Sequence, residues 1–95
     1  MPEPLLAALA DASPRVRAAA AGSLSSFEGH PGVLERLIRA VTEDRAEQVR
    51  VSAASSLGYL GDKRALPALQ AALADPGERV RYFARYAITK LNGSA

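Results

Sequence analysis

The apolar residues of this chain recur three times with the spacing of one helix face. When Val16, Val49 and Val80 are aligned, at offsets of 33 and 31 residues, apolar residues follow four, eight and eleven positions later in every copy. These positions hold Ala20, Ala53 and Ala84, then Leu24, Leu57 and Ile88, then Phe27, Leu60 and Leu91. At 100° per residue they lie within about 80° of one another, which predicts an amphipathic helix from each valine. We call these three the B helices.

A second apolar pattern precedes each B helix. The stretches VLERLIRAVTED and ALPALQAALAD carry apolar residues three and four positions apart, and PEPLLAALA is a shorter version. The boundaries carry helix signals: Ser13-Pro14 is an N-cap followed by proline, while Asp75-Pro76-Gly77, Gly61-Asp62 and Asn92-Gly93 mark breaks and ends. The sequence therefore predicts six helices in three antiparallel pairs, each an A helix followed by a B helix, with the first A helix truncated.

A repeat of this length is the signature of a solenoid. Three copies are about the minimum that can bury a continuous core, because each helical hairpin buries its apolar face only against its neighbours. The expected fold is all-α, a single domain over residues 1–95 with repeats at approximately 1–28, 29–61 and 62–92. The abundance of Ala and the scarcity of aromatic residues favour helices in close contact.

Two charged residues also recur with the valines. An arginine follows each valine directly and an aspartate stands five positions before it, which gives the set Asp11, Arg17, Asp44, Arg50, Asp75 and Arg81. In stacked repeats such a carboxylate can accept turn N–H groups and pair with the arginine of an adjacent repeat. Stacking requires the same residue in every repeat and a ligand site rarely does, so we interpret the six as a structural ladder. A ligand-binding row of arginines is the alternative.

These motifs resemble a known repeat family. The segment VRVSAASSLGYLGDKRALPALQAALADPGERVRYFARYAITKLNG is similar to the HEAT-like repeats first associated with phycobilin lyases, through D-x-x-x-x-V-R-x-x-A followed by L-G-x-x-G-D-x-x-A-x-x-x-L. The resemblance covers nearly the whole chain and is strongest over residues 44–92. It implies a right-handed α-solenoid of three HEAT-like hairpins. It does not select one function, because such repeats serve as scaffolds, lyases and other enzymes.

Catalytic and metal chemistry have little support in the residues. There is no cysteine, the glycines are scattered turn residues, and His30, beside Pro31, has the context of an exposed loop residue. The resemblance includes hydroxylases in which a His-Glu pair after Val-Arg binds iron, but this chain has Ala18-Ala19, Val51-Ser52 and Tyr82-Phe83 there. We expect no catalytic residue, no metal site, no cofactor and no enzymatic activity.

The positions that do not repeat are candidates for recognition. Opposite the valines, the first B helix has Arg15, Ala18, Ala21, Gly22 and Ser25, and the second has Gln48, Val51, Ala54, Ser55 and Gly58. These form a floor of small residues, whereas the third helix carries Arg79, Tyr82, Arg85, Tyr86 and Thr89. Tyr and Arg are enriched in interface hot spots. We predict that Arg79, Tyr82, Arg85 and Tyr86 bind another protein, the alternative being that they only cover the end of the solenoid.

Charge gives a second candidate. The formal net charge is +2, but residues 1–30 and 31–62 each sum to −1, and residues 63–95 sum to +4. Nucleic acid or another anionic ligand could therefore bind the last repeat, a prediction that we rank below protein binding. Neither end shows an evident polar cap, which indicates a fragment of a longer array, such as part of a HEAT-repeat enzyme, or self-association through the ends. No bilayer-spanning run or export signal is present, so a cytoplasmic protein without a membrane partner is expected.

Overall fold

The computed structural model describes residues 3–27 and 30–93, and these residues form six α-helices joined by short turns. The helices are α1 (Glu3–Ala8), α2 (Pro14–Ser23), α3 (Pro31–Glu43), α4 (Glu47–Leu60), α5 (Leu66–Ala72) and α6 (Glu78–Leu91). Single 3₁₀ turns, Leu24–Ser26 and Lys63–Ala65, follow α2 and precede α5. None of the described helices is long and apolar enough to cross a bilayer.

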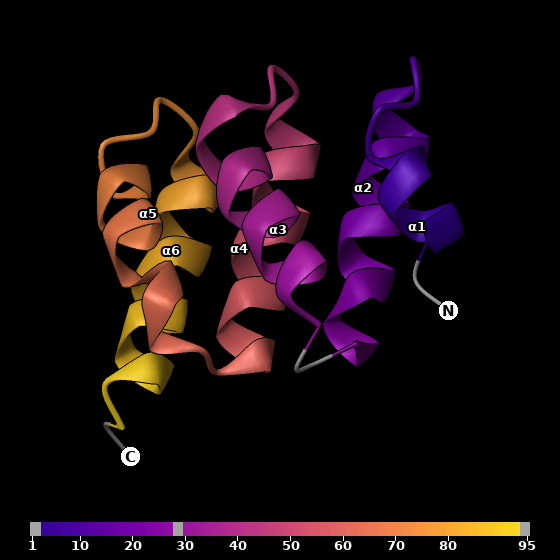
Figure 1. The fold of residues 1–95 in the computed structure, drawn as a ribbon. Helices are drawn as coiled ribbons and strands as arrows, with labels where there is room; N and C mark the ends of the chain where they lie inside the picture. Colours follow the sequence, from indigo (N-terminus) through magenta and orange to yellow (C-terminus); the bar gives the residue numbers. More distant parts are fainter. Residues whose placement is uncertain (1–2, 28–29, 94–95) are drawn as a thin grey trace.

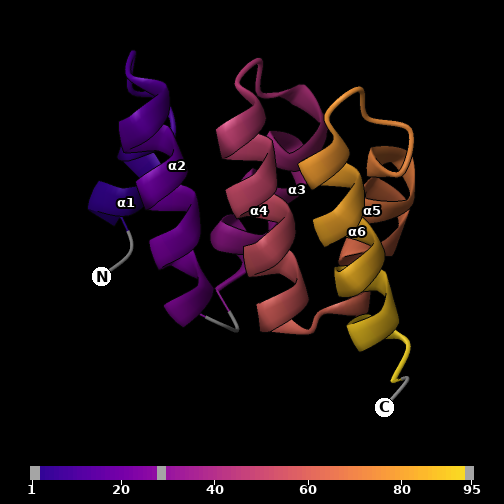
Figure 2. The same ribbon diagram turned by 180° about the vertical axis from the view of Figure 1, so that it is seen from behind.

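The helices form two layers. Figure 1 shows α1, α3 and α5, the A helices, in front, and Figure 2 shows α2, α4 and α6, the B helices, from the opposite side. Each hairpin stacks on the next, so the molecule grows along one axis from the N-terminal to the C-terminal repeat. The predicted all-α solenoid of three helical hairpins is confirmed.

Local sequence signals explain where the helices begin and end. Ser13 caps α2, because its Oγ accepts a hydrogen bond from the backbone N of Val16 at 3.4 Å, and Pro14 occupies the first helical position. Gly61 ends α4 with φ of +73°, a left-handed conformation that glycine adopts without strain. Asp62 then begins the next turn by accepting a hydrogen bond from Arg64 N at 2.9 Å.

The core lies between the two layers and is built from aliphatic side chains. The largest fully buried residues are Leu24, Leu37, Leu57, Leu69, Val33, Val41, Val49 and Val80. Val16 departs from the predicted pattern, because it is 40% exposed whereas Val49 and Val80 are completely buried. The reason is its position at the end of the stack: no described helix lies on the outer side of α2, and α1 has only six residues.

The B helices touch one another through small residues, and this corrects the predicted outer face. Ala21, Val51, Ala54 and Gly58 were expected on an exposed floor, but all four are buried. The central B helix, α4, packs against α2 on one side and α6 on the other, so the exposed strip is narrower than a single amphipathic helix would suggest. Ser56 shows how closely the helices approach, since its buried Oγ donates a 2.6 Å hydrogen bond to the carbonyl oxygen of Ala21.

Gly58 is the tightest point of this contact. A Cβ atom at Gly58 would lie 2.9 Å from the Cβ and 3.1 Å from the Cα of Ala87 on α6. These atoms belong to a helix backbone and its first side-chain carbon, so they can move only if α6 moves. The absence of a side chain at Gly58 therefore sets the distance between α4 and α6.

We predict that Gly58→Ala destabilises the protein, although alanine is the better helix former. The clash should lower the free energy of unfolding by about 1–3 kcal/mol, measured by chemical denaturation. Gly22→Ala in α2 is the matched control, because a Cβ there meets nothing within 4 Å. It should leave stability equal or raise it by up to about 1 kcal/mol. A Gly58→Ala variant as stable as the wild type would contradict this account.

Candidate functional site

The structure pairs the ladder residues between consecutive repeats. Arg17 Nε and Nη2 donate to the Asp44 carboxylate at 2.9 and 3.2 Å, and Arg50 Nε and Nη2 donate to the Asp75 carboxylate at 2.8 and 3.2 Å. The Nη1 atoms donate to carbonyl oxygens in the turn that precedes each arginine, Arg17 to Asp11 O and Arg50 to Asp44 O, both at 2.8 Å. Each of these arginines thus joins the turn of its own repeat to the turn of the next one.

These two ion pairs are shielded from solvent. The four side chains are at most 13% exposed, whereas Arg64, in an ion pair with Asp62, is 72% exposed. A bidentate geometry in such surroundings is rigid and directional, and removing one partner leaves a charge that water reaches poorly. Pairs of this kind fix the relative placement of two elements more firmly than surface pairs do.

One carboxylate of each kind of pair, Asp44 in a shielded pair and Asp62 in the exposed pair, has a pKa below its usual range. Burial by itself raises the pKa of Asp44, but the hydrogen bond from Arg17, the backbone N–H of Ala46 and the charges of Arg17 and Arg45 together outweigh it and lower the pKa. In the exposed pair, the hydrogen bonds from the side chain and backbone of Arg64 lower the pKa of Asp62 to about 2. Asp44 is therefore ionised in the folded protein at neutral pH.

Two predicted ladder residues stand at the ends of the row. Asp11 Oδ1 accepts a hydrogen bond from Ser13 N at 2.9 Å, and Arg81 Nη1 donates to the carbonyl oxygen of Asp75 at 2.7 Å. Within the described residues neither side chain forms an ion pair. The structure thus brings four of the six residues together and leaves one carboxylate and one guanidinium at opposite ends.

The four residues predicted to bind a partner are all exposed on α6. Tyr82 and Tyr86 are each 57% exposed, and Arg79 and Arg85 on the same helix are exposed as well. The ring of Tyr82 meets the half-buried ring of Phe83 edge to face, with centroids 5.2 Å apart, and Lys90 Nζ lies 5.9 Å from the ring centroid of Tyr86. The side chains form one strip of aromatic and cationic groups along the helix.

A depression beside this strip joins residues of the small-residue floor to Ser52, Ser56, Tyr59 and Phe83, which the sequence pattern did not assign to recognition. It has a volume of about 280 Å³ and is lined by Gly22, Ser25, Val51, Ser52, Ser55, Ser56, Tyr59 and Phe83. The serines and Gly22 form its small, polar side, while Tyr59, which is 70% exposed, and Phe83 supply aromatic walls. Tyr59 is exposed because it lies on the exposed strip of α4, which also carries Gln48 and Ser55.

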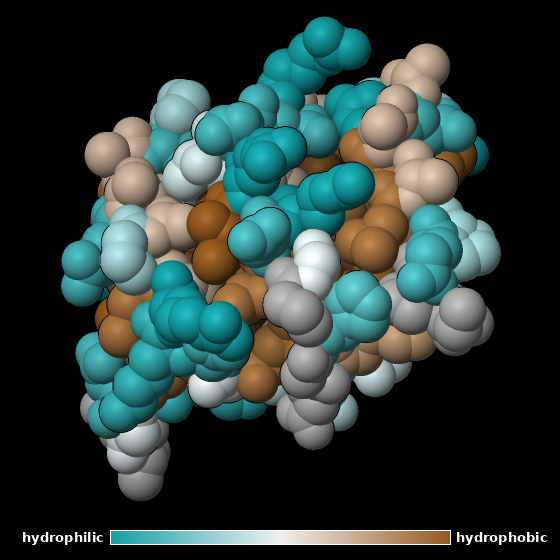
Figure 3. Space-filling model, viewed as in Figure 1, coloured by the Kyte–Doolittle hydropathy of each residue, from teal (hydrophilic) through white to brown (hydrophobic). Residues whose placement is uncertain are grey.

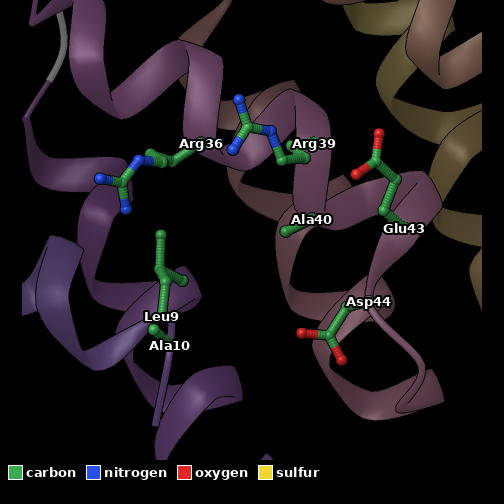
Figure 4. A pocket seen from close by; sticks show the side chains of 7 residues that line it. All are labelled: Leu9, Ala10, Arg36, Arg39, Ala40, Glu43 and Asp44. Atoms are coloured by element: carbon green, nitrogen blue, oxygen red, sulfur yellow. The ribbon is translucent and has the colours of Figure 1, made fainter.

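A second depression lies on the A-helix side. It has a volume of about 270 Å³. Figure 4 shows Arg36 and Arg39 of α3 on one side of it and Leu9 and Ala10 on the other. It exists because α1 ends at Ala8 and does not cover the full length of α3. Asp44 at its border is already bound to Arg17. On this face the hydrophobic residues occur in separate areas between hydrophilic ones (Figure 3).

His30 lies at the start of α3 and does not occupy the exposed position expected of it. It is half-buried, and its Nδ1 is buried without a hydrogen-bond partner. A Cβ atom at Gly32 would lie 3.2 Å from the imidazole carbon Cε1 of His30. Over residues 3–27 and 30–93, no cluster of three or more His, Asp or Glu side chains is arranged to hold a metal ion.

The stacked helical hairpins correspond to a known family of repeats. The family model for HEAT repeats matches residues 2–91. The chain belongs to the HEAT-repeat family. The resemblance found in its sequence is thereby confirmed, and the Asp–Arg pairs are contacts between its HEAT repeats.

The HEAT-repeat fold also matches a solved structure. The complex of CpcE and CpcF of phycocyanin lyase from Nostoc sp. PCC7120 contains a chain with a TM-score of 0.86 and 31% sequence identity. The match covers 96% of this HEAT-repeat chain and 37% of that chain. This protein therefore spans little more than a third of the length of its structural neighbour. No curated protein sequence matches it.

We predict that the ion pair of Asp44 makes the stability of this HEAT-repeat protein pH-dependent. The pKa of Asp44 is lower in the folded state than in the unfolded chain, so its contribution is complete above about pH 4 and is lost as pH falls through the folded-state value. In Arg17→Gln, Asp44 stays shielded from solvent but loses the positive charge that binds it. The difference in unfolding free energy between wild type and Arg17→Gln should be largest near neutral pH and narrow on acidification.

Denaturant titrations at several pH values measure this difference. Arg39→Gln is the control, because it removes the same charge from an exposed residue. Its difference from the wild type should stay small and nearly constant with pH. A difference for Arg17→Gln that is independent of pH would show that Asp44 does not carry the effect.

Proposed function

We propose that this HEAT-repeat chain is a non-catalytic recognition module that binds another protein on its B-helix surface. The observation that carries the proposal is the exposure of all three tyrosines of the chain on α4 and α6: Tyr59 is 70% exposed, and Tyr82 and Tyr86 are each 57% exposed. Aromatic rings gathered on one face leave apolar surface in water that a partner can cover, and their hydroxyl groups can bond to it.

The arrangement suits a partner segment that is helical or extended. Arg79, Tyr82, Arg85 and Tyr86 recur along one side of α6, so a segment lying along this helix would meet a guanidinium or an aromatic ring at each turn. The depression between Ser55, Tyr59 and Phe83 adjoins the strip and has room for one or two side chains of that segment. Cationic residues on the strip favour a partner with acidic side chains.

The structural neighbour supports protein binding in general terms. It is one chain of a complex between CpcE and CpcF, so a related repeat array associates with another polypeptide. This agrees with the proposed role and does not identify the partner. The chromophore chemistry named in that description gives another candidate, in which this chain is part of a larger HEAT-repeat enzyme such as a chromophore lyase. The length of the native open reading frame distinguishes that candidate from an independent binding module.

A further candidate function is the binding of an anionic ligand such as a nucleic acid. The formal charge of residues 63–95 is +4, and Arg79, Arg85 and Lys90 are exposed beside tyrosines on which bases can stack. Anisotropy titrations with single- and double-stranded oligonucleotides test it, and true binding should weaken steeply as salt is raised from about 50 to about 200 mM. No binding at the lower salt concentration would eliminate this candidate.

We predict that the double variant Tyr82→Ala/Tyr86→Ala loses the protein partner. Proteins recovered by affinity capture from the native host would be tested for direct binding by titration, and the double variant should weaken the dissociation constant at least about tenfold. The control is Arg39→Ala/Gln70→Ala on the A-helix layer, where both residues are also exposed. The control should bind as the wild type does. Equal affinity of all three proteins for every recovered partner would refute this site.

A further inference from the structure

The last arginine of the ladder is held in the same manner as the two that form ion pairs. Arg81 Nη1 donates to the carbonyl oxygen of Asp75 at 2.7 Å, as Arg17 Nη1 donates to Asp11 O and Arg50 Nη1 to Asp44 O, each at 2.8 Å. In Arg17 and Arg50, Nε and Nη2 hold the aspartate of the next repeat. In Arg81 these atoms have no carboxylate among the described residues.

The first aspartate shows the complementary half of the same contact. Asp11 Oδ1 accepts the backbone N–H of Ser13 at 2.9 Å, just as Asp44 accepts that of Ala46 at 2.9 Å and Asp75 that of Gly77 at 2.8 Å. The turn therefore positions the carboxylate as it does in the two repeats where an arginine binds it. Asp11 is exposed, and its side-chain carboxylate forms no ion pair with a described arginine.

We infer that two copies of this chain associate head to tail, with Asp11 of one copy bound by Arg81 of the other. The contact repeats the bidentate pair that already joins the repeats within one chain. Charge favours this occupant over an unrelated surface, because residues 63–95 sum to +4 and residues 1–30 to −1. The inference concerns the ends of the solenoid, and of the binding surface proposed above it involves only Arg85.

The surfaces around the two half-contacts also fit. Ser56 of α4 faces α2 within the chain. Ser23 is the residue of α2 at the same position of the repeat, and it is exposed on the outer side of α2, as Val16 is. Ala19 lies one helical turn before Ser23. Val16 is 40% exposed, while its counterparts Val49 and Val80 are buried. On α6 the places of Ala54 and Gly58 are taken by the larger Arg85 and Thr89, which the small residues Ala19 and Ser23 of a second copy can accommodate.

The expected assembly is open and weak. A head-to-tail contact leaves one free end of each kind, so copies add to one another without closing into a two-fold dimer. The single ion pair and the larger residues on α6 make the contact looser than that between α4 and α6. Association should therefore increase with concentration and decrease with salt, since the approaching ends carry opposite charge.

Sedimentation velocity of the whole chain, from about 10 µM to about 1 mM, measures this association. The wild type should form dimers and larger species as concentration rises, and Asp11→Asn and Arg81→Gln should each remain monomeric over the same range. An equimolar mixture of the two variants should form dimers and nothing larger, because it retains a single intact pair of ends. Circular dichroism checks that each variant is folded.

Asp62→Asn and Arg64→Gln are the matched controls, because they change charge by the same amounts in an ion pair away from the ends. Both should assemble like the wild type. If Arg81→Gln lowers the stability of the fold, Asp11→Asn alone tests the contact, since Asp11 is exposed. The proposal fails if the wild type is monomeric throughout, if Asp11→Asn assembles like the wild type, or if the mixed variants do not dimerise.

Discussion

The fold depends on two ion pairs, in which an arginine near the start of α2 or α4 binds the aspartate in the turn of the next repeat. Arg17 and Arg50 hold Asp44 and Asp75 with two hydrogen bonds each, and bind their own turns through Nη1. A hydrophobic contact alone would allow one hairpin to rotate or slide on the next. A planar guanidinium bound on two sides permits little of either, so a recurring Val-Arg pair sets the direction of the stack.

With this direction fixed, small residues determine how near the B helices come. Ala21, Ala54 and Gly58 lie between neighbouring helices, and the contact of Gly58 with Ala87 leaves no space for a methyl group. Surface available for recognition is consequently confined to a narrow strip on each B helix. The strip is lined by small side chains on α2 and most of α4, and by aromatic and cationic groups at Tyr59 and along α6. A partner bound along the B helices would therefore contact small side chains at the α2 end and aromatic and cationic side chains at the α6 end.

Much of this architecture could be predicted from the sequence, because stacking requires the same residues in every repeat. The helix pattern from Val49 and Val80 and the spacing of the aspartates and arginines were sufficient for the solenoid. The outer face of the B helices was assigned wrongly, because an amphipathic pattern locates the core of one helix and carries no information about neighbours on its two flanks. Ala54 is exposed on an isolated helix and buried in the stack. The exposure of Val16 and the depression beside Tyr59 also depend on neighbouring helices, so the helix pattern could not predict them.

The claim that a shielded Arg–Asp pair holds successive repeats together is tested most directly by a double-mutant cycle on Arg50 and Asp75. Denaturant unfolding of the wild type, Arg50→Ala, Asp75→Ala and the double variant gives their coupling energy. For a pair with these side chains at most 13% exposed, the coupling should be about 2 kcal/mol or more. A coupling within the range of exposed surface pairs, below about 0.5 kcal/mol, would contradict the account.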